Sequence, residues 1–323
     1  MLKPKIFITR RIPEAGLDLL LEHCELAIWE KDLPPSHEEI LKLVPGVNGI
    51  LSLLTDKIDA EIMDQAGSQL AVISNYAVGF NNIDIQAANQ RKIAISNTPD
   101  VLTDATADHA FALMLAAGRY IVAGEKNVQN GQWKTWGPKF FLGVDFKGAT
   151  LGLIGYGRIG KAMAKRASGF DMKVIFYDPS AIPDKNAHKV ELETLFRESD
   201  FISLHAPLTP TTRYLVNQDS FKLMKPNCVL INTARGEMVE SQAFYNALKN
   251  NQIFAAGIDV TDPEPIPMDS PLLTLENLII TPHIASASFK TREAMAIMAA
   301  NNLIAGTQGK RLPNIVNPEV YSQ

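Results

Sequence analysis

Hydrophobic and polar positions along the first hundred residues follow two alternating periods. Short apolar runs predict strands, and the stretches between them have the spacing of amphipathic helices. The expected strands are residues 5–9, 25–29, 47–53, 70–74 and 93–96, and the expected helices are 16–22, 37–44, 60–66 and 85–91. Strands that alternate with helices in this way predict a small parallel α/β domain.

A second alternation begins near Gly148, after one long helix expected from Asp104 to Gln129 with Thr103 or Asp104 as its N-cap. Its strands are expected at residues 151–154, 173–177, 201–204, 229–232, 255–258 and 278–281. Six strands with helices between them predict a doubly wound sheet. A last helix, about 288–306, follows that sheet and could return to the first domain. We therefore expect an α/β protein with one domain of residues 1–102 and 287–323 and another of residues 103–286.

A glycine-rich motif joins the first strand of the second alternation to a helix. It reads Gly155-Tyr156-Gly157-Arg158-Ile159-Gly160, and Asp178 ends the next expected strand. The first glycine permits a tight turn, the second leaves room for a pyrophosphate, and the third lets the helix approach the strand. The helix N-terminus adds N–H groups and the positive end of a dipole. An ordinary glycine-rich turn is the alternative, but the flanking elements and the acid favour NAD binding.

Composition narrows the class of protein. The chain has 323 residues, 46% of them hydrophobic and 20% charged, and a formal charge of −4. This balance argues against a nucleic-acid surface. The apolar run at residues 110–118 is too short to cross a bilayer, and no secretory segment is visible at the start of the chain. Cys24 and Cys228 form neither a disulfide framework nor a metal pattern, so we expect a cytosolic protein without metal.

Three chemically complementary residues each follow one of the last three expected strands. They are Arg235, Glu264 and His283. Because ligands bind beyond the carboxyl ends of parallel strands, the three could meet at one edge. Arginine can hold a carboxylate with two hydrogen bonds, histidine can exchange a proton, and a nearby carboxylate favours the imidazolium. Taken alone, Arg235 could form a salt bridge at a helix end, Glu264 could be a solvated loop acid, and His283 could be an ordinary turn histidine. Together with a nicotinamide they indicate reduction of a 2-oxo acid.

Several motifs carry a family resemblance. Residues 155–160, 232–236, 257–260, 263–265 and 281–284, in this order, resemble the D-isomer-specific 2-hydroxyacid dehydrogenases, and the likeness covers almost the whole chain. Residues 75–79, 97–104 and 286–289 resemble the glyoxylate/hydroxypyruvate reductase branch. The resemblance implies a Rossmann cofactor domain, a flavodoxin-like substrate domain with the active-site cleft between them, and homodimers. The aromatic segment 132–146 is favoured as a subunit contact.

The resemblance also implies roles for particular residues. Arg235 would hold the substrate carboxylate and keto oxygen, His283 would be the acid/base, and Glu264 would support His283. Backbone N–H groups of Val78 and Gly79 would complete carboxylate binding, with Leu54 lining the pocket. Cofactor contacts would come from the glycine motif with its Arg158 and Ile159, and from Thr106, Asp178, His205, Pro207, Thr212, Thr233, Ala234 and Asp259, the last near the carboxamide.

Asp178 indicates the choice of cofactor. An acid at this position accepts hydrogen bonds from both ribose hydroxyls and repels a 2′-phosphate. NADPH-preferring proteins that resemble this chain carry Ser-Arg or a similar pair here, whereas no Lys or Arg follows Asp178 until Lys185. We expect NADH to be preferred, although Arg158 could partly compensate.

The expected activity is NAD(P)H-dependent reduction of a small 2-oxo acid, with glyoxylate and hydroxypyruvate as first substrates and His283 as proton donor. Alternatives in the same family are a 2-ketogluconate reductase and a phosphoglycerate dehydrogenase without a regulatory domain. A different class, an NAD-sensing protein similar to transcriptional corepressors, keeps the same fold and triad. Turnover with a panel of 2-oxo acids would separate the classes.

Overall fold

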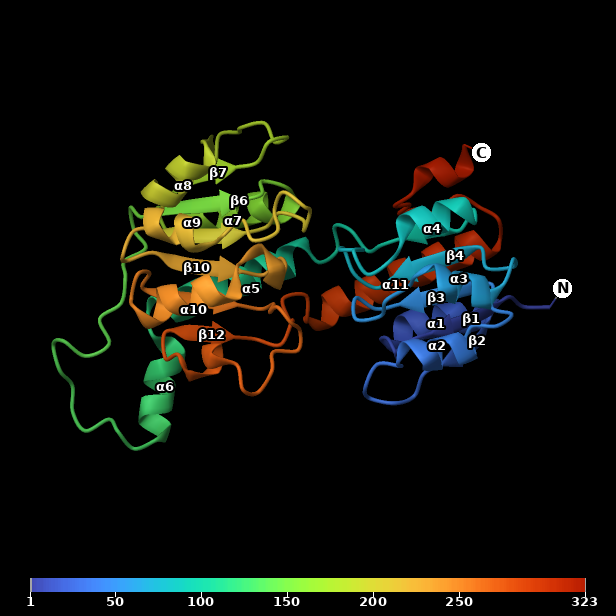
Figure 1. Cartoon of the computed structure of the whole chain (residues 1–323), viewed down its shortest axis with the longest axis horizontal. Coiled ribbons are helices and arrows are strands. Elements are labelled where there is room, and N and C mark those ends of the chain that lie inside the picture. The colour runs from blue at the N-terminus through green and yellow to red at the C-terminus, as the bar shows by residue number, and fades with distance from the viewer. Residues whose placement is uncertain (1, 323) are drawn as a thin grey trace. The chain divides into compact units, whose positions relative to one another are not determined.

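The computed structural model describes residues 2–322 and divides into two compact units (Figure 1). Among the described residues, the N-terminal unit consists of residues 2–102 with 287–322, and the central unit consists of residues 103–286. Each unit contains a parallel sheet covered by helices, so the expected α/β class with two parallel sheets is confirmed.

The sheet of the N-terminal unit has the strand order β2-β1-β3-β4-β5. The strands are β1 (Lys5–Ile8), β2 (Glu25–Ile28), β3 (Gly49–Ser52), β4 (Val72–Asn75) and β5 (Ala94–Ser96), and all neighbours run parallel. This is the order of a flavodoxin-like sheet. Every residue of β3 and β4 is buried, as expected of parallel strands with helices on both faces.

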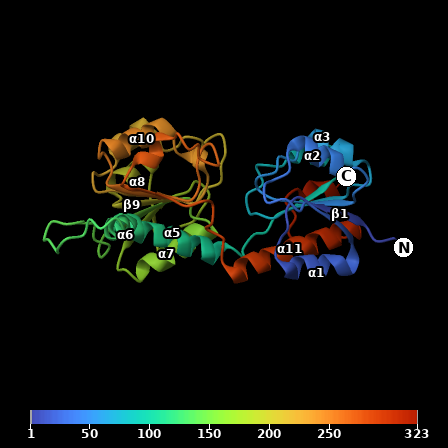
Figure 2. The same cartoon turned by 90° about the horizontal axis from the view of Figure 1, so that it is seen from below.

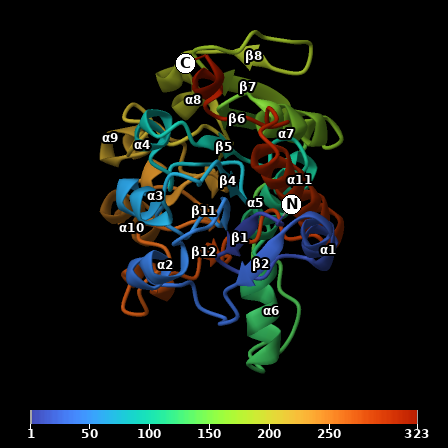
Figure 3. The ribbon, with the colours of Figure 1, turned by 90° about the vertical axis from the view of Figure 1, so that its right-hand side faces the viewer.

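Helices from both ends of the chain cover this sheet. The helices α2 (His37–Leu43) and α3 (Ala60–Ala66) lie on one face, and α1 (Glu14–His23) and α11 (Phe289–Thr307) lie side by side on the other (Figure 2, Figure 3). The short α4 (Ile85–Gln90) and the 3-10 turn η3 (Pro318–Tyr321) complete the unit. A Cβ on Gly16 would lie 2.7 Å from the Cβ of Ala296 and 2.8 Å from its carbonyl, so α1 and α11 approach closely only because Gly16 has no side chain.

The central unit has a seven-stranded parallel sheet in the order β12-β11-β10-β9-β6-β7-β8. The strands are β6 (Thr150–Ile154), β7 (Lys173–Tyr177), β8 (His188–Lys189), β9 (Phe201–Leu204), β10 (Val229–Asn232), β11 (Ala255–Ile258) and β12 (Leu278–Ile280). The sequence predicted six of these strands and missed β8. That strand has two residues, both polar and exposed, and therefore has no hydrophobic periodicity.

Helices pack on both faces of this sheet (Figure 2). The helices α5 (Thr103–Gly118) and α7 (Arg158–Ser168) enclose one core, in which Phe111, Met163 and Phe176 are buried. On the other face, Phe221 and Phe244 are buried under α8 (Leu192–Glu198), α9 (Gln218–Leu223) and α10 (Ser241–Lys249). The 3-10 turns η1 (Gly236–Met238) and η2 (Pro271–Thr274) connect the later elements. Within residues 2–322, no helix combines the length and hydropathy needed to cross a membrane.

The long helix expected from Asp104 to Gln129 is wrong, because two helices occupy this stretch. The first, α5, ends at Gly118, and α6 (Ile121–Gln129) begins after Tyr120, which has a left-handed backbone with φ of 53°. The carbonyl of Gly118 accepts a hydrogen bond from Val144 N, and the Tyr120 ring packs against Phe254. The expected N-cap, Thr103 or Asp104, is also wrong, since α5 begins at Thr103 and both residues therefore lie inside the helix.

Candidate functional site

The glycine motif forms the turn between β6 and α7. Gly155 has φ of +94°, and a Cβ there would lie 2.6 Å from the backbone of His205 and Ala206. A Cβ on Gly160 would collide with the carbonyl oxygen of Gly155, whereas a Cβ on Gly157 would meet no described atom within 4 Å. Packing therefore requires the first and third glycines, while the second faces open space through which a phosphate can approach.

Asp178 follows β7 beside this turn, and its carboxylate is held by backbone N–H groups and one side-chain hydroxyl. Its Oδ2 accepts a hydrogen bond from Tyr156 N at 2.9 Å, and its Oδ1 accepts from Ser180 N and Oγ at 2.9 Å and from Ala181 N at 3.1 Å. Burial alone would raise the pKa of Asp178, but these hydrogen bonds outweigh it and lower the pKa. The carboxylate is therefore ionised at neutral pH.

Three of the other expected cofactor residues follow β9, which is next to β6 in the sheet. His205, Pro207 and Thr212 follow β9, and Thr212 Oγ1 donates to the Pro207 carbonyl at 2.7 Å. Burial lowers the pKa of His205 to about 3, so this imidazole is neutral across the usual assay range. Thr106 lies in the first turns of α5 and is buried.

Thr233 supplies an observation that points to a ligand. It follows β10, and its Oγ1 is buried without a hydrogen-bond partner among the residues that the structure describes. A buried hydroxyl without a partner costs free energy unless a bound group satisfies it. Its neighbour Ala234 donates its backbone N–H to Asn232 Oδ1 at 3.0 Å. With the open position at Gly157, these residues fit a dinucleotide.

His283 and Glu264 form a direct pair. The His283 Nδ1 lies 2.6 Å from Glu264 Oε1, and the side chains are 24% and 34% exposed. The Thr261 N–H donates to the other carboxylate oxygen at 3.3 Å. Because the carboxylate is an acceptor, Nδ1 carries a proton in this pair, which directs Nε2 away as the atom available for exchange.

Arg235 follows β10, the neighbour of the strand that precedes Glu264. Its Nη1 donates to the Ala234 carbonyl at 2.7 Å, and its own carbonyl accepts from Asn232 Nδ2 at 2.8 Å. Burial lowers the pKa of the guanidinium, and the charges of Glu264 and Glu237 oppose that effect. A guanidinium remains charged under such conditions. The structure thus brings Arg235, Glu264 and His283 to one edge of the sheet.

The turn that carries His283 depends on a buried carboxylate, Asp259, which is 1% exposed. Its Oδ1 accepts from Thr281 Oγ1 at 2.6 Å and from Ile284 N at 2.8 Å, and its Oδ2 accepts from Ala285 N at 2.7 Å. The backbone N–H of His283, whose φ is 54°, donates to the Asp259 carbonyl at 2.9 Å. Asp259 therefore fixes the turn on both sides of His283.

His109 belongs to the same network, although the sequence analysis gave it no role. Its Nε2 lies 3.0 Å from Thr281 Oγ1 and 3.4 Å from Asp259 Oδ1. Burial alone would raise the pKa of Asp259, but the bonds from His109, Thr281 and the two N–H groups lower it. One signal was available in the sequence: His109 stands three residues after Thr106 and so shares a face of α5 with an expected cofactor contact.

The expected substrate contacts outside the central unit lie in the loops after β3 and β4. Leu54 follows β3, and Val78 and Gly79 follow β4, its neighbour in the sheet. The carbonyl of Val78 accepts from Asn97 Nδ2 and that of Gly79 accepts from Asn75 Nδ2, each at 2.8 Å. Side chains of the flanking strand ends thus hold this loop at the carboxyl edge of its own sheet.

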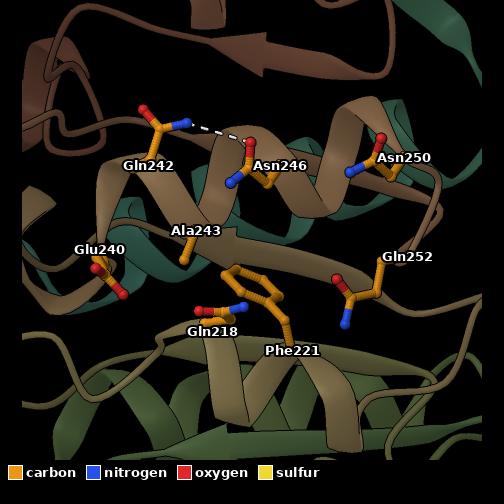
Figure 4. A pocket seen from close by; sticks show the side chains of 8 residues that line it. All are labelled: Gln218, Phe221, Glu240, Gln242, Ala243, Asn246, Asn250 and Gln252. Atoms are coloured by element: carbon orange, nitrogen blue, oxygen red, sulfur yellow. Dashed lines mark hydrogen bonds between the residues drawn. The ribbon is translucent and has the colours of Figure 1, made fainter.

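A hollow between α9 and α10 is separate from these residues. It is lined by carboxamide side chains, among which Gln242 donates to Asn246 at 3.2 Å, and by Glu240 (Figure 4). None of the expected catalytic, cofactor or substrate residues lines it.

Comparison with known proteins identifies the family of the chain. The model of the D-isomer specific 2-hydroxyacid dehydrogenase NAD binding domain matches residues 111–285. The chain belongs to this family. It is 47% identical to a glyoxylate reductase from Korarchaeum cryptofilum, over 99% of this chain and 97% of the relative. The family resemblance predicted from the sequence is therefore confirmed, and the protein is an NAD(P)-dependent oxidoreductase.

Solved structures share the fold over the full length. The TT0316 protein from Thermus thermophilus is 44% identical with a TM-score of 0.93, covering 97% of this chain and 99% of that one. An NADPH-dependent glyoxylate/hydroxypyruvate reductase from Sinorhizobium meliloti, in complex with NADP and malonate, is 30% identical with a TM-score of 0.85 and covers 98% of both chains.

The Asp259 network generates a prediction. Asp259→Asn places an N–H₂ group where one of the N–H or O–H donors now points, so the turn at residues 281–285 loses at least one hydrogen bond. We expect kcat to fall about 10- to 100-fold and amide hydrogen exchange at Ile284 and Ala285 to accelerate. Steady-state kinetics and exchange measured by mass spectrometry check this. Asp219→Asn, on the exposed surface of α9, is the control. Unchanged exchange at the turn would contradict the assigned role.

Proposed function

We propose that the protein reduces small 2-oxo acids, with glyoxylate and hydroxypyruvate as first substrates, to the 2-hydroxy acids, using NADH. The observation that carries this proposal is the 2.6 Å contact between His283 and Glu264, at the sheet edge that also holds Arg235 and the glycine turn. The names of the relatives, glyoxylate reductase and glyoxylate/hydroxypyruvate reductase, support the choice of substrate.

The proposed chemistry divides between the charged groups. When bound, a reduced nicotinamide supplies the hydride that C2 of the 2-oxo acid receives. His283 donates the proton on Nε2 to the keto oxygen, so the products are the 2-hydroxy acid and a neutral imidazole. Glu264 stabilises the protonated ring before transfer and holds its orientation through Nδ1. Arg235 holds the substrate carboxylate and draws electron density from the carbonyl.

The substrate carboxylate would have further donors. The backbone N–H groups of Val78 and Gly79 are proposed to contact it, and Leu54 is proposed to line the substrate pocket. Two observations support this: these residues lie at the carboxyl edge of their sheet, and Asn75 and Asn97 hold the carbonyls of the loop. In parallel α/β sheets this edge is where ligands bind.

The proposed preference for NADH rests on the ionised Asp178. A 2′-phosphate beside this carboxylate would be repelled, whereas ribose hydroxyls can donate to it. The Sinorhizobium meliloti relative is named NADPH-dependent, so family membership alone does not decide the cofactor.

We also propose that the chain forms homodimers through the aromatic segment at residues 132–146 and the neighbouring α6. Trp133, Trp136 and Leu142 are 59%, 79% and 65% exposed. The structure describes every residue of α6, and none of them is buried. Large apolar side chains that are exposed together in one segment are typical of protein interfaces.

The cytoplasm is the proposed location. Cys24 and Cys228 are free thiols buried in different units, which suits a reducing compartment.

Arg235→Lys tests the carboxylate contact. Lysine keeps the charge but loses the two parallel N–H donors, so we expect KM for glyoxylate to rise, kcat to fall, and kcat/KM to drop about 100-fold or more. NADH affinity should change by less than about twofold, because the substitution keeps the charge. Arg197→Lys replaces an arginine paired with Glu193 on the surface of α8 and should behave as the parent protein. If Arg235→Lys retained normal kcat/KM, the substrate carboxylate would be held elsewhere.

Glu264→Gln tests the proton donor. Loss of the carboxylate charge disfavours protonated His283, so the loss of reductase activity with rising pH should begin at lower pH. Oxidation of the 2-hydroxy acid needs neutral His283, and its rise with pH should shift in the same direction. His205 stays neutral across the pH range of the assay, so it cannot cause either the fall of reduction or the rise of oxidation with pH. The measurement is the pH dependence of kcat/KM in both directions, with Glu193→Gln as control. Profiles that superimpose on those of the parent would show that the pair does not act together.

Asp178→Ala tests the cofactor preference. We expect the parent protein to have a higher kcat/KM with NADH than with NADPH. In the variant the ratio of these two values should fall about tenfold or more, because the repulsion of a 2′-phosphate disappears. Kinetics with NADH and NADPH at fixed glyoxylate measure the ratio, and Asp219→Ala on α9 is the control. A parent protein that used NADPH equally well would contradict the proposal.

A further inference from the structure

The loop at residues 179–187, between β7 and β8, lies next to Asp178 and is held at two places. Near its start, Lys189 Nζ donates to the carbonyls of Pro179 and Ala181 at 3.0 and 3.1 Å. Farther along, Asp184 Oδ1 accepts from Asn186 N at 2.8 Å and from the Tyr156 hydroxyl at 2.9 Å. The second place is therefore tied to the glycine motif, which lies before β7 in the chain.

Tyr156 stands between the first two glycines of that motif and is 1% exposed. Its ring stacks on Phe176 of β7, with centroids 4.1 Å apart and planes 14° from parallel. Its backbone N–H donates to Asp178 Oδ2, and its hydroxyl donates to Asp184 Oδ1. One residue thus contacts the core, the Asp178 carboxylate and the distal part of the loop.

We propose that Tyr156 is a positioning residue for cofactor selection, and that its hydrogen bond to Asp184 holds the loop at residues 179–187 in the arrangement that favours NADH over NADPH. This inference rests on the proposed NADH-dependent function and assigns a residue that sets its selectivity.

The physical link runs through Asp178. Its Oδ1 accepts three hydrogen bonds from Ser180 and Ala181, which belong to the start of this loop. The direction of the carboxylate therefore depends on the position of the loop. The loop also carries Lys185, an exposed cation directly after Asp184. While the Tyr156 hydroxyl is bonded to Asp184, the backbone that carries Lys185 is fixed in place. When this hydrogen bond is lost, Lys185 can move and pair with a 2′-phosphate, a group that arginine and lysine bind.

Removal of a single hydroxyl separates this role from packing. Tyr156→Phe keeps the ring that stacks on Phe176 and the backbone N–H that donates to Asp178. Burial and the hydrogen bond to Asp184 raise the pKa of Tyr156, so the hydroxyl is a neutral donor throughout the assay range. Asp184→Ala removes the acceptor from the exposed side and leaves Tyr156 in place.

The test compares the parent protein with Tyr156→Phe, Asp184→Ala and the double variant. Fluorescence titration measures the Kd for NADH and for NADPH, and hydrogen exchange reports on the amides of Asn186 and Ala187. We expect the ratio Kd(NADPH)/Kd(NADH) to fall about three- to tenfold in each single variant. We expect faster exchange in the loop of Tyr156→Phe, in which Asp184 still accepts from Asn186 N. The double variant should match Asp184→Ala, because that substitution already removes the acceptor of the Tyr156 hydroxyl together with the acceptor of Asn186 N.

Tyr321→Phe is the matched control, since its oxygen accepts from Leu312 N at 3.0 Å in the N-terminal unit. An unchanged Kd ratio in both single variants overturns the proposal, even if exchange becomes faster. If Tyr156→Phe does not fold, Asp184→Ala decides the result. A parent protein that binds NADPH more tightly contradicts the proposed NADH preference alone; a fall of the ratio in the variants would still support the role of Tyr156.

Discussion

Seven strands of the central unit run parallel, so their carboxyl ends all lie at one edge of the sheet. Strand direction alone therefore places every residue that directly follows a strand at that edge. The glycine turn, Asp178, Thr233, Arg235, Glu264 and His283 all follow strands of this sheet. The same edge also receives the N-terminus of α7, where the positive end of the helix dipole favours anionic ligands. Strand direction is the constraint on which the candidate site depends.

Two kinds of carboxylate meet at this edge, and their environments suit different roles. Asp259 is 1% exposed and accepts its hydrogen bonds from within the protein, so it fixes the turn of His283. Glu264 is 34% exposed and contacts the ring that is proposed to exchange a proton. A buried carboxylate with several donors stays ionised and rigid. The pair of His283 and Glu264 is instead partly exposed at the sheet edge.

Much of the fold could be predicted because its signals are local. Buried parallel strands such as β9 and β10 are short and mostly apolar, and the sequence places them at the residues that the structure shows. The features that sequence reasoning missed depend on contacts between distant residues. The break at Tyr120 accompanies a bond from Val144 to Gly118 and a ring contact with Phe254, and nothing in the local helical pattern indicates either contact.

The same distinction applies to the site. Arg235, Glu264 and His283 could be proposed from their positions after strands, because the topology brings such positions together. For His109 the sequence offers only its place three residues after Thr106, since its partners Thr281 and Asp259 come from elements far along the chain. Groups that follow strands, the supporting Asp259 among them, lie where the chain direction places them, whereas His109 reaches the same network through the packing of α5. A sequence therefore reveals the former before the latter, and the supporting network around His283 required the three-dimensional arrangement of α5, β11 and β12.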